Sequence, residues 1–453
     1  MWLMACLFML HAPEQSVLVR WTPRAETSLL TDVAKTVVGV SWWAESRGQL
    51  LMIVRESALD GLASIGLLER LPYDANLDLL SVIPCNQTAD LEVLLEGGRF
   101  AIVAGSPSFK GAHCFHGPIR IMTNLVLEVA TPVALPLSPC NTLSQLADEV
   151  DANRWLSDIQ SLASFNRYTH NDGNVPARDW LVSQFQQIPN LDVWTESFNV
   201  NSTETFNVFA RLNGSIRADE IYIVGAHYDS ISENPQQAAP GAEDNASGTA
   251  ALLEMARALA NKSPQATILF IAYSGEEQGL RGSIDHATDL VNSGEAAHIK
   301  AVLIMDMIGY TADADLDCLL ETNSANQWII DELSTYAANY TSLRIVSSLF
   351  PFGSDHVPYL DRGMPSLLTI ENDWNIYPNY HRTNDLPASI DLNMGREIMR
   401  MNLVAIADWS DAVTCVDVFE LMTGWGMSAQ APGDTNGNGV IDVVDLLEHG
   451  FAM

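Results

Sequence analysis

Acidic residues and histidines occur together in five short motifs between residues 225 and 385. Carboxylates mixed with imidazoles are the ligands with which a pair of zinc ions holds and activates one water molecule. The sequence therefore predicts a metal site assembled from segments far apart in the chain. The residues that carry this chemistry are His227, Asp229, Asp244, Glu276, Glu277, Asp306 and His381.

The adjacent pair Glu276-Glu277 gives the strongest single indication. It follows the apolar run Ile268–Tyr273 and is flanked by Gly275 and Gly279. Two neighbouring carboxylates after a buried strand are costly unless a cation holds at least one of them. One can bind a metal while the other takes a proton from the metal-bound water. The alternative is a solvated turn, which the preceding apolar run disfavours.

Asp306 and Asp244 give weaker indications when each is taken alone. Asp306 lies in the apolar run Val302–Ile308, where an unpaired charge would be expensive, and this favours a ligand role. Asp244 stands just before an expected helix at Thr249–Ala260, so it could simply cap that helix. Asp244 therefore keeps two interpretations at this point.

The two histidine motifs also leave alternatives open. Asp229 could accept a hydrogen bond from His227 and fix its tautomer, although a lone histidine near a carboxylate is more often structural. His381 follows the loop Asn375–Asn379, and His356 is a competing histidine nearby.

Short apolar or β-branched runs precede three of the motifs and predict the strands that position them. These runs are Glu220–Val224, Thr267–Ala272 and Ala301–Met305. Buried parallel strands have this composition, and α/β folds carry their chemistry at the carboxyl ends of such strands. We therefore expect residues 141–412 to form an α/β domain with a mixed, largely parallel central sheet flanked by helices.

The region before residue 140 predicts a smaller, separate domain. Residues 16–71 indicate a βαββαβ order, which matches a ferredoxin-like unit of the kind that peptidase propeptides often use. A strand-rich stretch follows and ends in Pro132, Pro136 and Pro139, which suggest a linker. We expect residues 15–140 to be an α+β accessory or propeptide-like domain, after a signal-like segment over residues 1–14.

Composition restricts the class of partner and the compartment. The chain has 453 residues, with 56 acidic against 23 basic side chains and a formal net charge of -33, and this charge disfavours nucleic-acid binding. The apolar start is too short to span a bilayer and resembles a signal peptide, so we expect a secreted or periplasmic protein with no transmembrane segment. Disulfides among Cys85, Cys114 and Cys140 are then possible, with the connectivity left open.

Taken together, in this order and at this spacing, the five motifs resemble those of the co-catalytic zinc aminopeptidase family. That family includes bacterial leucyl aminopeptidases and aminopeptidase S, with glutamate carboxypeptidase II and glutaminyl cyclase as more distant members. The resemblance covers roughly residues 150–410 and implies an exopeptidase acting on peptides with a free N-terminus.

The resemblance also implies a role for each residue. One zinc ion would be bound by His227, Asp244 and Asp306, and the second by Asp244, Glu277 and His381. Glu276 would be the general base that takes a proton from a hydroxide-forming water between the ions, and Asp229 would support His227. A carboxypeptidase or a glutaminyl cyclase-like enzyme on the same fold remains an alternative, as does a catalytically inert binding or scaffold protein.

The C-terminal residues, 413–453, predict a calcium-binding module. Their spacing matches positions 1, 3, 5, 7, 9 and 12 of a calcium loop, with Gly439 at position 6. Aspartate at position 12 resembles a dockerin-type repeat, but dockerins normally carry two loops. A cohesin-like partner is therefore the weaker expectation, and a calcium-stabilised tail the stronger one. The predicted ligands are Asp434, Asn436, Asn438, the carbonyl of Val440, Asp442 and Asp445.

Overall fold

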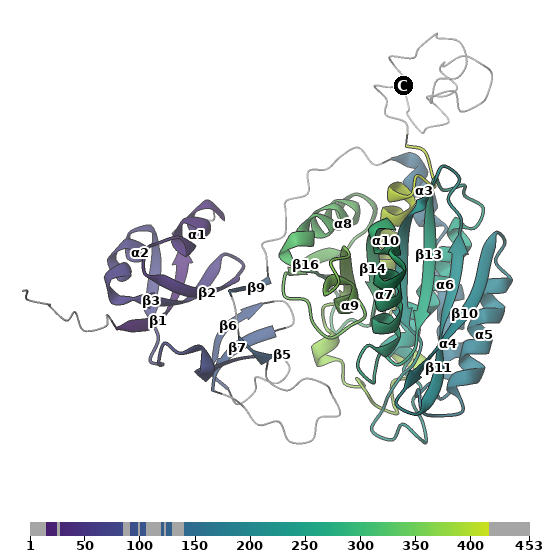
Figure 1. Ribbon diagram of the computed structural model, residues 1–453, viewed down its shortest axis with the longest axis horizontal. Coiled ribbons are helices and arrows are strands. Elements are labelled where there is room, and N and C mark those ends of the chain that lie inside the picture. The colour runs from purple at the N-terminus through teal and green to yellow at the C-terminus, as the bar shows by residue number, and fades with distance from the viewer. Residues whose placement is uncertain are drawn as a thin grey trace, which may run out of the picture. The chain divides into compact units, whose positions relative to one another are not determined.

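The computed structural model describes residues 15–24, 28–84, 91–97, 100–105, 119–121, 124–128 and 140–415. The chain divides into two compact units (Figure 1). One unit extends to Ala130 and includes Ser347–Phe350, and the other holds the remainder of the chain. The signal-like segment and the predicted calcium loop, with all six of its ligands, lie outside the described residues.

The N-terminal unit has the expected βαββαβ order. Its main sheet runs β4-β1-β3-β2, with β9 (Leu125–Glu128) added beside β2. Side chains alternate across β1, so Val17, Val19 and Trp21 face a core that includes Leu62 of α2. This unit confirms the predicted α+β character. Its first elements are β1 (Ser16–Pro23), α1 (Ser28–Lys35), β2 (Val40–Ser46), β3 (Gln49–Arg55), α2 (Leu59–Ile65) and β4 (Gly66–Arg70).

A second, four-stranded sheet completes the N-terminal unit. Its strand order is β6-β7-β5-β8, and the pairs for which a register is defined are antiparallel. The strands are β5 (Leu80–Pro84), β6 (Val93–Gly97), β7 (Phe100–Ala104) and β8 (Ile119–Arg120).

The larger unit is built on an eight-stranded sheet with the order β10-β11-β13-β12-β14-β17-β15-β16. The four central strands, β13-β12-β14-β17, are parallel, whereas the β10–β11, β11–β13 and β15–β17 pairs are antiparallel. The predicted mixed sheet is thus confirmed. The strands are β10 (Leu191–Val200), β11 (Thr203–Leu212), β12 (Arg217–His227), β13 (Ala266–Tyr273), β14 (Ile299–Met305), β15 (Asp317–Glu321), β16 (Arg344–Ser348) and β17 (Ser366–Glu371).

Helices flank this sheet, as Figure 1 shows. All eight residues of β13 are buried, as expected of a strand that is covered on both faces. Ile223, Ile271 and Ile304 of neighbouring strands pack with Ala287 and Leu290 in one core cluster. The helices are α3 (Asn141–Asp148), α4 (Ala152–Ala163), α5 (Asn174–Gln186), α6 (Gly248–Leu259), α7 (Arg281–Ser293), α8 (Gln327–Tyr340), α9 (Val357–Leu360) and α10 (Leu392–Trp409).

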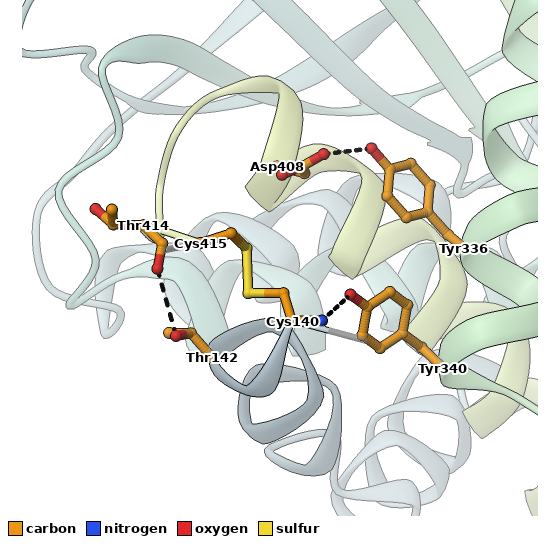
Figure 2. The surroundings of a disulfide bond; sticks show 7 residues. All are labelled: Cys140, Thr142, Tyr336, Tyr340, Asp408, Thr414 and Cys415. Atoms are coloured by element: carbon orange, nitrogen blue, oxygen red, sulfur yellow. Dashed lines mark hydrogen bonds between the residues drawn. A yellow bond between two sulfur atoms is a disulfide. The ribbon is translucent and has the colours of Figure 1, made fainter. Parts of the chain in front are cut away.

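A disulfide bond between Cys140 and Cys415 joins the two ends of the described part of this unit (Figure 2). Cys140 stands directly before α3, and Cys415 follows α10, with their Cα atoms 5.7 Å apart. The backbone N–H of Cys140 also donates to Tyr340 Oη of α8 at 2.8 Å. A bond from Cys140 to Cys85 or Cys114, which the sequence left possible, is therefore excluded, because tertiary packing brings a much later cysteine to Cys140. Cys318 is a buried free thiol.

Within the described residues, we find no helix with the length and apolar character needed to span a bilayer.

Candidate metal centre

Three adjacent parallel strands deliver predicted ligands to one edge of the sheet. His227 is the last residue of β12, Glu276 and Glu277 follow β13 after a two-residue turn, and Asp306 comes directly after β14. Because parallel neighbours end at the same edge, these side chains converge. Asp244 reaches the same place from the segment before α6, and His381 from the loop after β17.

Asp244 lies between the two predicted histidine ligands. Its Oδ1 is 3.3 Å from Nε2 of His227, and its Oδ2 is 3.0 Å from Nε2 of His381. Each carboxylate oxygen therefore faces one imidazole, which is the arrangement expected of a carboxylate shared by two metal ions.

The remaining ligands divide between the two histidines. Nε2 of His227 is 3.3 Å from Oδ1 of Asp306 and 4.0 Å from Oε2 of Glu276. Nε2 of His381 is 3.1 Å from Oε2 of Glu277. Ligand atoms within 4.8 Å of one another thus define two groups, each able to hold a metal ion: His227, Glu276 and Asp306 in one, and Asp244, Glu277 and His381 in the other.

Asp229 supports both this edge and the glutamate pair. Its carboxylate accepts the backbone N–H of Glu276 at 3.2 Å and that of Glu277 at 3.3 Å, and the hydroxyl of Thr169 at 3.1 Å. Nδ1 of His227 lies 3.1 Å from the backbone carbonyl of Asp229 and 3.6 Å from its Oδ1. The nearer partner of the imidazole is therefore the carbonyl, and an Nδ1–H donated to it would leave Nε2 free for a metal.

The alternative interpretation of Asp244 as a helix cap is wrong. Helix α6 begins at Gly248, its N-cap residue is Ser247, and the side chain of Ser247 makes no capping hydrogen bond. Asn245 accepts the N–H of Gly248 at 2.9 Å, while its own side-chain amide donates to the carbonyl of Met305 at 2.9 Å. Asn245 therefore ties the start of α6 to the end of β14 and leaves the carboxylate of Asp244 for the histidines.

The segment Ser354-Asp355-His356 contributes a serine and not a ligand histidine. Ser354 Oγ donates to Oδ2 of Asp306 at 2.7 Å, so Oδ1 of Asp306 is the oxygen that faces His227. His356 is fully buried with Nε2 3.6 Å from Glu321, and in the part of the chain that the structure describes it joins neither ligand group. His381 is thus the histidine that the fold brings to Asp244.

Burial and charge strongly perturb the ionisable groups at this edge. Burial raises the pKa of Glu277 to about 7 and raises that of Glu276 well above the usual carboxylic value. Burial alone would raise the pKa of Asp244, but hydrogen bonds from His227 and His381 outweigh it and lower that pKa. Burial opposes protonation of His227, yet Asp306 and Glu276 raise its pKa well above the usual value.

The donor set fits divalent zinc. Five carboxylates, those of Asp229, Asp244, Glu276, Glu277 and Asp306, meet two imidazoles in one small volume. Oε1 of Glu277 is buried and has no hydrogen-bond partner within the described residues. Such a concentration of negative charge is expensive unless cations neutralise it. Oxygen and imidazole nitrogen donors are ligands that zinc accepts.

Sequence reasoning missed two buried charged residues beside the centre. Arg167 is fully buried and donates to the carbonyls of Tyr228 and Gly241, at 2.6 and 2.7 Å, which fastens the segment before Asp244. Burial lowers its pKa to about 10, so it stays charged at neutral pH. Asp385 is 1% exposed and accepts hydrogen bonds from two backbone amides. Asp385 ends the fifth motif, but that motif indicates no role for it, and Arg167 lies in no pattern that distinguishes it from a surface charge.

The family comparison agrees with this geometry. Residues 207–406 match the model of peptidase family M28. A probable leucine aminopeptidase of Arthroderma otae is 33% identical over 254 residues, which cover 52% of this chain and 67% of that protein. The chain belongs to peptidase family M28. A probable zinc metalloprotease of Pyrenophora teres f. teres is 34% identical over 201 residues, or 39% of this chain and 43% of that protein. The chain thus spans about two thirds of one relative and under half of the other.

Solved structures show the same fold. The LapA aminopeptidase of Legionella pneumophila is similar with a TM-score of 0.56 at 18% identity, covering 88% of this chain and 99% of that one. A zinc aminopeptidase of Bacillus subtilis is similar with a TM-score of 0.52 at 18% identity, covering 60% and 98%. Membership in M28 confirms the predicted class of protein, a metallopeptidase and hence a hydrolase.

Proposed function

We propose that this M28 peptidase is an aminopeptidase that removes N-terminal residues from peptides with the help of two zinc ions. The observation that carries the proposal is the position of Asp244, whose two carboxylate oxygens face Nε2 of His227 and Nε2 of His381 at 3.3 and 3.0 Å. A carboxylate so placed can serve two ions at once. One ion would take His227, Asp244 and Asp306, and the other Asp244, Glu277 and His381.

Zinc bound there would lower the pKa of a water molecule towards neutrality and polarise the scissile carbonyl. Glu276 is the residue suited to move the proton. Its Oε2 lies 4.0 Å from Nε2 of His227, and burial raises its pKa above the usual carboxylic value, which is the direction that suits a general base. Glu276 would accept the proton of the attacking water and then deliver it to the leaving amine.

The residues behind the ligands keep this arrangement rigid. Asp229 holds the backbone of both glutamates, which fixes the direction of Glu276 relative to Glu277. Ser354 holds the outer oxygen of Asp306 and leaves the inner one for the metal. Such supporting hydrogen bonds typically change metal affinity or activity by about 10- to 100-fold.

The preference for a free N-terminus is supported by the relatives, several of which are named leucine aminopeptidases. The experiment is to titrate metal-stripped protein with Zn²⁺ and measure hydrolysis of aminoacyl-anilides and of the same compounds with a blocked amine. The proposal expects activity on free-amine substrates that rises to two zinc ions per chain. Hydrolysis of the blocked anilides alone would indicate an endopeptidase, and hydrolysis confined to N-blocked peptides with a free C-terminal carboxylate would indicate a carboxypeptidase. Cyclisation of N-terminal glutamine at one zinc per chain would indicate a glutaminyl cyclase.

We also propose that the protein is exported and that its tail binds calcium. The Cys140–Cys415 disulfide supports export, since such bonds persist in oxidising compartments. The spacing of the six tail ligands from Asp434 to Asp445 supports calcium binding. Docking of the tail to a cohesin-like partner is a further possibility that a binding assay with and without calcium would test.

A further inference from the structure

Asp385 is a buried residue whose carboxylate and backbone carbonyl together accept three consecutive backbone N–H groups from the segment carrying Asp244. Its Oδ1 accepts the N–H of Glu243 at 2.9 Å, and its Oδ2 accepts the N–H of Asp244 at 3.0 Å. Its backbone carbonyl accepts the N–H of Ala242 at 3.1 Å. One residue thus fixes the path of the chain through the shared ligand.

Asp385 is tied equally closely to the segment that carries His381. It follows His381 by four positions, and its backbone N–H donates to the carbonyl of Arg382 at 3.1 Å. Tyr377, from the other side of His381, donates its hydroxyl to Oδ1 of Asp385 at 2.7 Å. The loop around His381 is therefore closed onto the same carboxylate that holds Asp244.

These two sets of contacts meet across the metal site. Nε2 of His381 lies 3.0 Å from Oδ2 of Asp244, although the two residues come from distant parts of the chain. Hydrogen bonds to the side chain of Asp385 connect the two segments beside this contact. Charge-assisted hydrogen bonds to a carboxylate are about twice as strong as neutral ones, so this connection is stiff.

We infer that Asp385 is a positioning residue for the site formed by Asp244, Glu277 and His381, because it sets the position of Asp244 relative to His381. The inference deepens the proposed function and rests on it. Asp385 itself touches neither substrate nor the reacting atoms in this account. It acts through the ligands, and its removal should change metal binding before it changes anything else.

The first test is Asp385→Asn in the full-length protein, with Co²⁺ as a spectroscopic probe of the metal-stripped site. Asparagine keeps the volume but has one accepting oxygen. If that oxygen stays with Glu243 and Tyr377, the amide NH₂ opposes the N–H of Asp244. We expect one of two Co²⁺ binding steps to weaken by about 10- to 100-fold, and the other to change by less than about threefold.

The matched control is Asp219→Asn, the same chemical change at an exposed position of β12 that takes no part in these contacts. Both Co²⁺ steps should stay within about threefold of wild type. If Asp385→Asn does not fold, Asp385→Glu serves instead, since it keeps both accepting oxygens but displaces them by one methylene. A positioning role predicts that Asp385→Glu also weakens one of the two Co²⁺ binding steps and spares the other.

Two results would overturn the inference. Normal Co²⁺ binding by Asp385→Asn and Asp385→Glu would show that the site does not depend on this residue. Equal weakening of both steps, with a lower Tm of the metal-free protein, would show a general role in folding. In either case wild-type binding and hydrolysis would be unchanged, and the proposed function would stand. If the wild-type protein itself bound no metal, the proposed function and this inference would fail together.

Discussion

The carboxylate of Asp229 holds the backbone of Glu276, accepting its N–H at 3.2 Å on the oxygen that also lies 3.6 Å from Nδ1 of His227. Its other oxygen accepts the N–H of Glu277 at 3.3 Å. A single side chain at the end of β12 therefore sets the turn after β13. The relative positions of the predicted base and its neighbouring ligand depend on this one group.

Replacement of Asp229 should impair catalysis without removing any proposed ligand. In Asp229→Asn, one of the two glutamate amides loses its acceptor, so we expect kcat/KM to fall by about 10- to 100-fold. Steady-state kinetics with aminoacyl-anilides would measure the change. Thr169→Val is the control, because it removes one hydrogen bond to Asp229 but leaves both glutamate amides paired with the carboxylate, so a smaller loss is expected. An equal fall of kcat/KM in the two variants would contradict the claim that Asp229 positions the two glutamates.

Glu276→Gln should separate catalysis from metal binding. It removes the proton acceptor but keeps the size of the side chain, so we expect kcat to fall by about 10²- to 10⁴-fold. Zinc content, measured by atomic absorption, should stay at two ions per chain. The exposed Glu204→Gln is a control for the same chemical change at a distance from the site. A Glu276→Gln protein with normal kcat would show that another group is the base.

The metal-free protein should lose stability as the pH rises from about 5 to 7. Burial raises the pKa of Glu277 to about 7, so folding favours its protonated form. As the pH rises from the ordinary pKa of 4.5 to the folded-state pKa of about 7, this preference is lost, and the free energy of unfolding falls by about 3 kcal/mol. His227, whose pKa is also raised, contributes in the same direction, because its stabilising proton leaves as the pH rises.

Zinc should reverse this trend, since it replaces the protons and binds more tightly as they leave. Urea unfolding at pH 5, 6 and 7, with and without zinc, would measure both effects. The stabilisation by zinc should grow with pH. A metal-free protein that gains stability from pH 5 to 7 would contradict the assigned pKa directions.

Loss of the Cys140–Cys415 bond should lower stability and spare the chemistry. The bond closes a loop with a sequence separation of 275, for which chain entropy predicts about 6 kcal/mol. For a unit of this size the double variant Cys140→Ser/Cys415→Ser should melt about 10–20 °C lower, with kcat within about twofold. Reducing agent should lower the wild-type Tm towards that of the variant. An unchanged Tm in the double variant would contradict the role of the bond.

Calcium should bind independently of the zinc site. Isothermal titration of zinc-loaded protein should show one Ca²⁺ per chain, and the double variant Asp434→Ala/Asp445→Ala should abolish it without changing kcat. These two residues stand at the first and last positions of the predicted loop. Calcium binding that survives in the variant would show that the ion binds elsewhere.

The sequence predicts the site well where strands deliver it. Apolar runs that precede His227, Glu276 and Asp306 indicate buried strands, and parallel pairing then brings their ends together. Asp244 and His381 come from loops, and only their resemblance to a family connects them with the strands. The structure brings all five to the same edge of the sheet.

Other contacts cannot be predicted from local pattern, because they depend on tertiary packing. Asp385 ends the fifth motif and Ser354 precedes the Asp355-His356 pair, but the sequence assigns neither of them a role, and both hold backbone or side-chain atoms of ligands. The pairing of Cys140 with Cys415 depends on α3 meeting the end of α10, which no spacing rule encodes. For the same reason, the side chain that accepts a hydrogen bond from the first turn of α6 is that of Asn245 and not that of Asp244.

The most direct test of the central claim is anomalous diffraction at the zinc edge from crystals of the zinc-loaded protein. The account predicts two peaks, one beside each carboxylate oxygen of Asp244, with His227 at the first and His381 at the second. A single peak, or peaks away from Asp244, would contradict the shared-carboxylate site on which the proposed function depends.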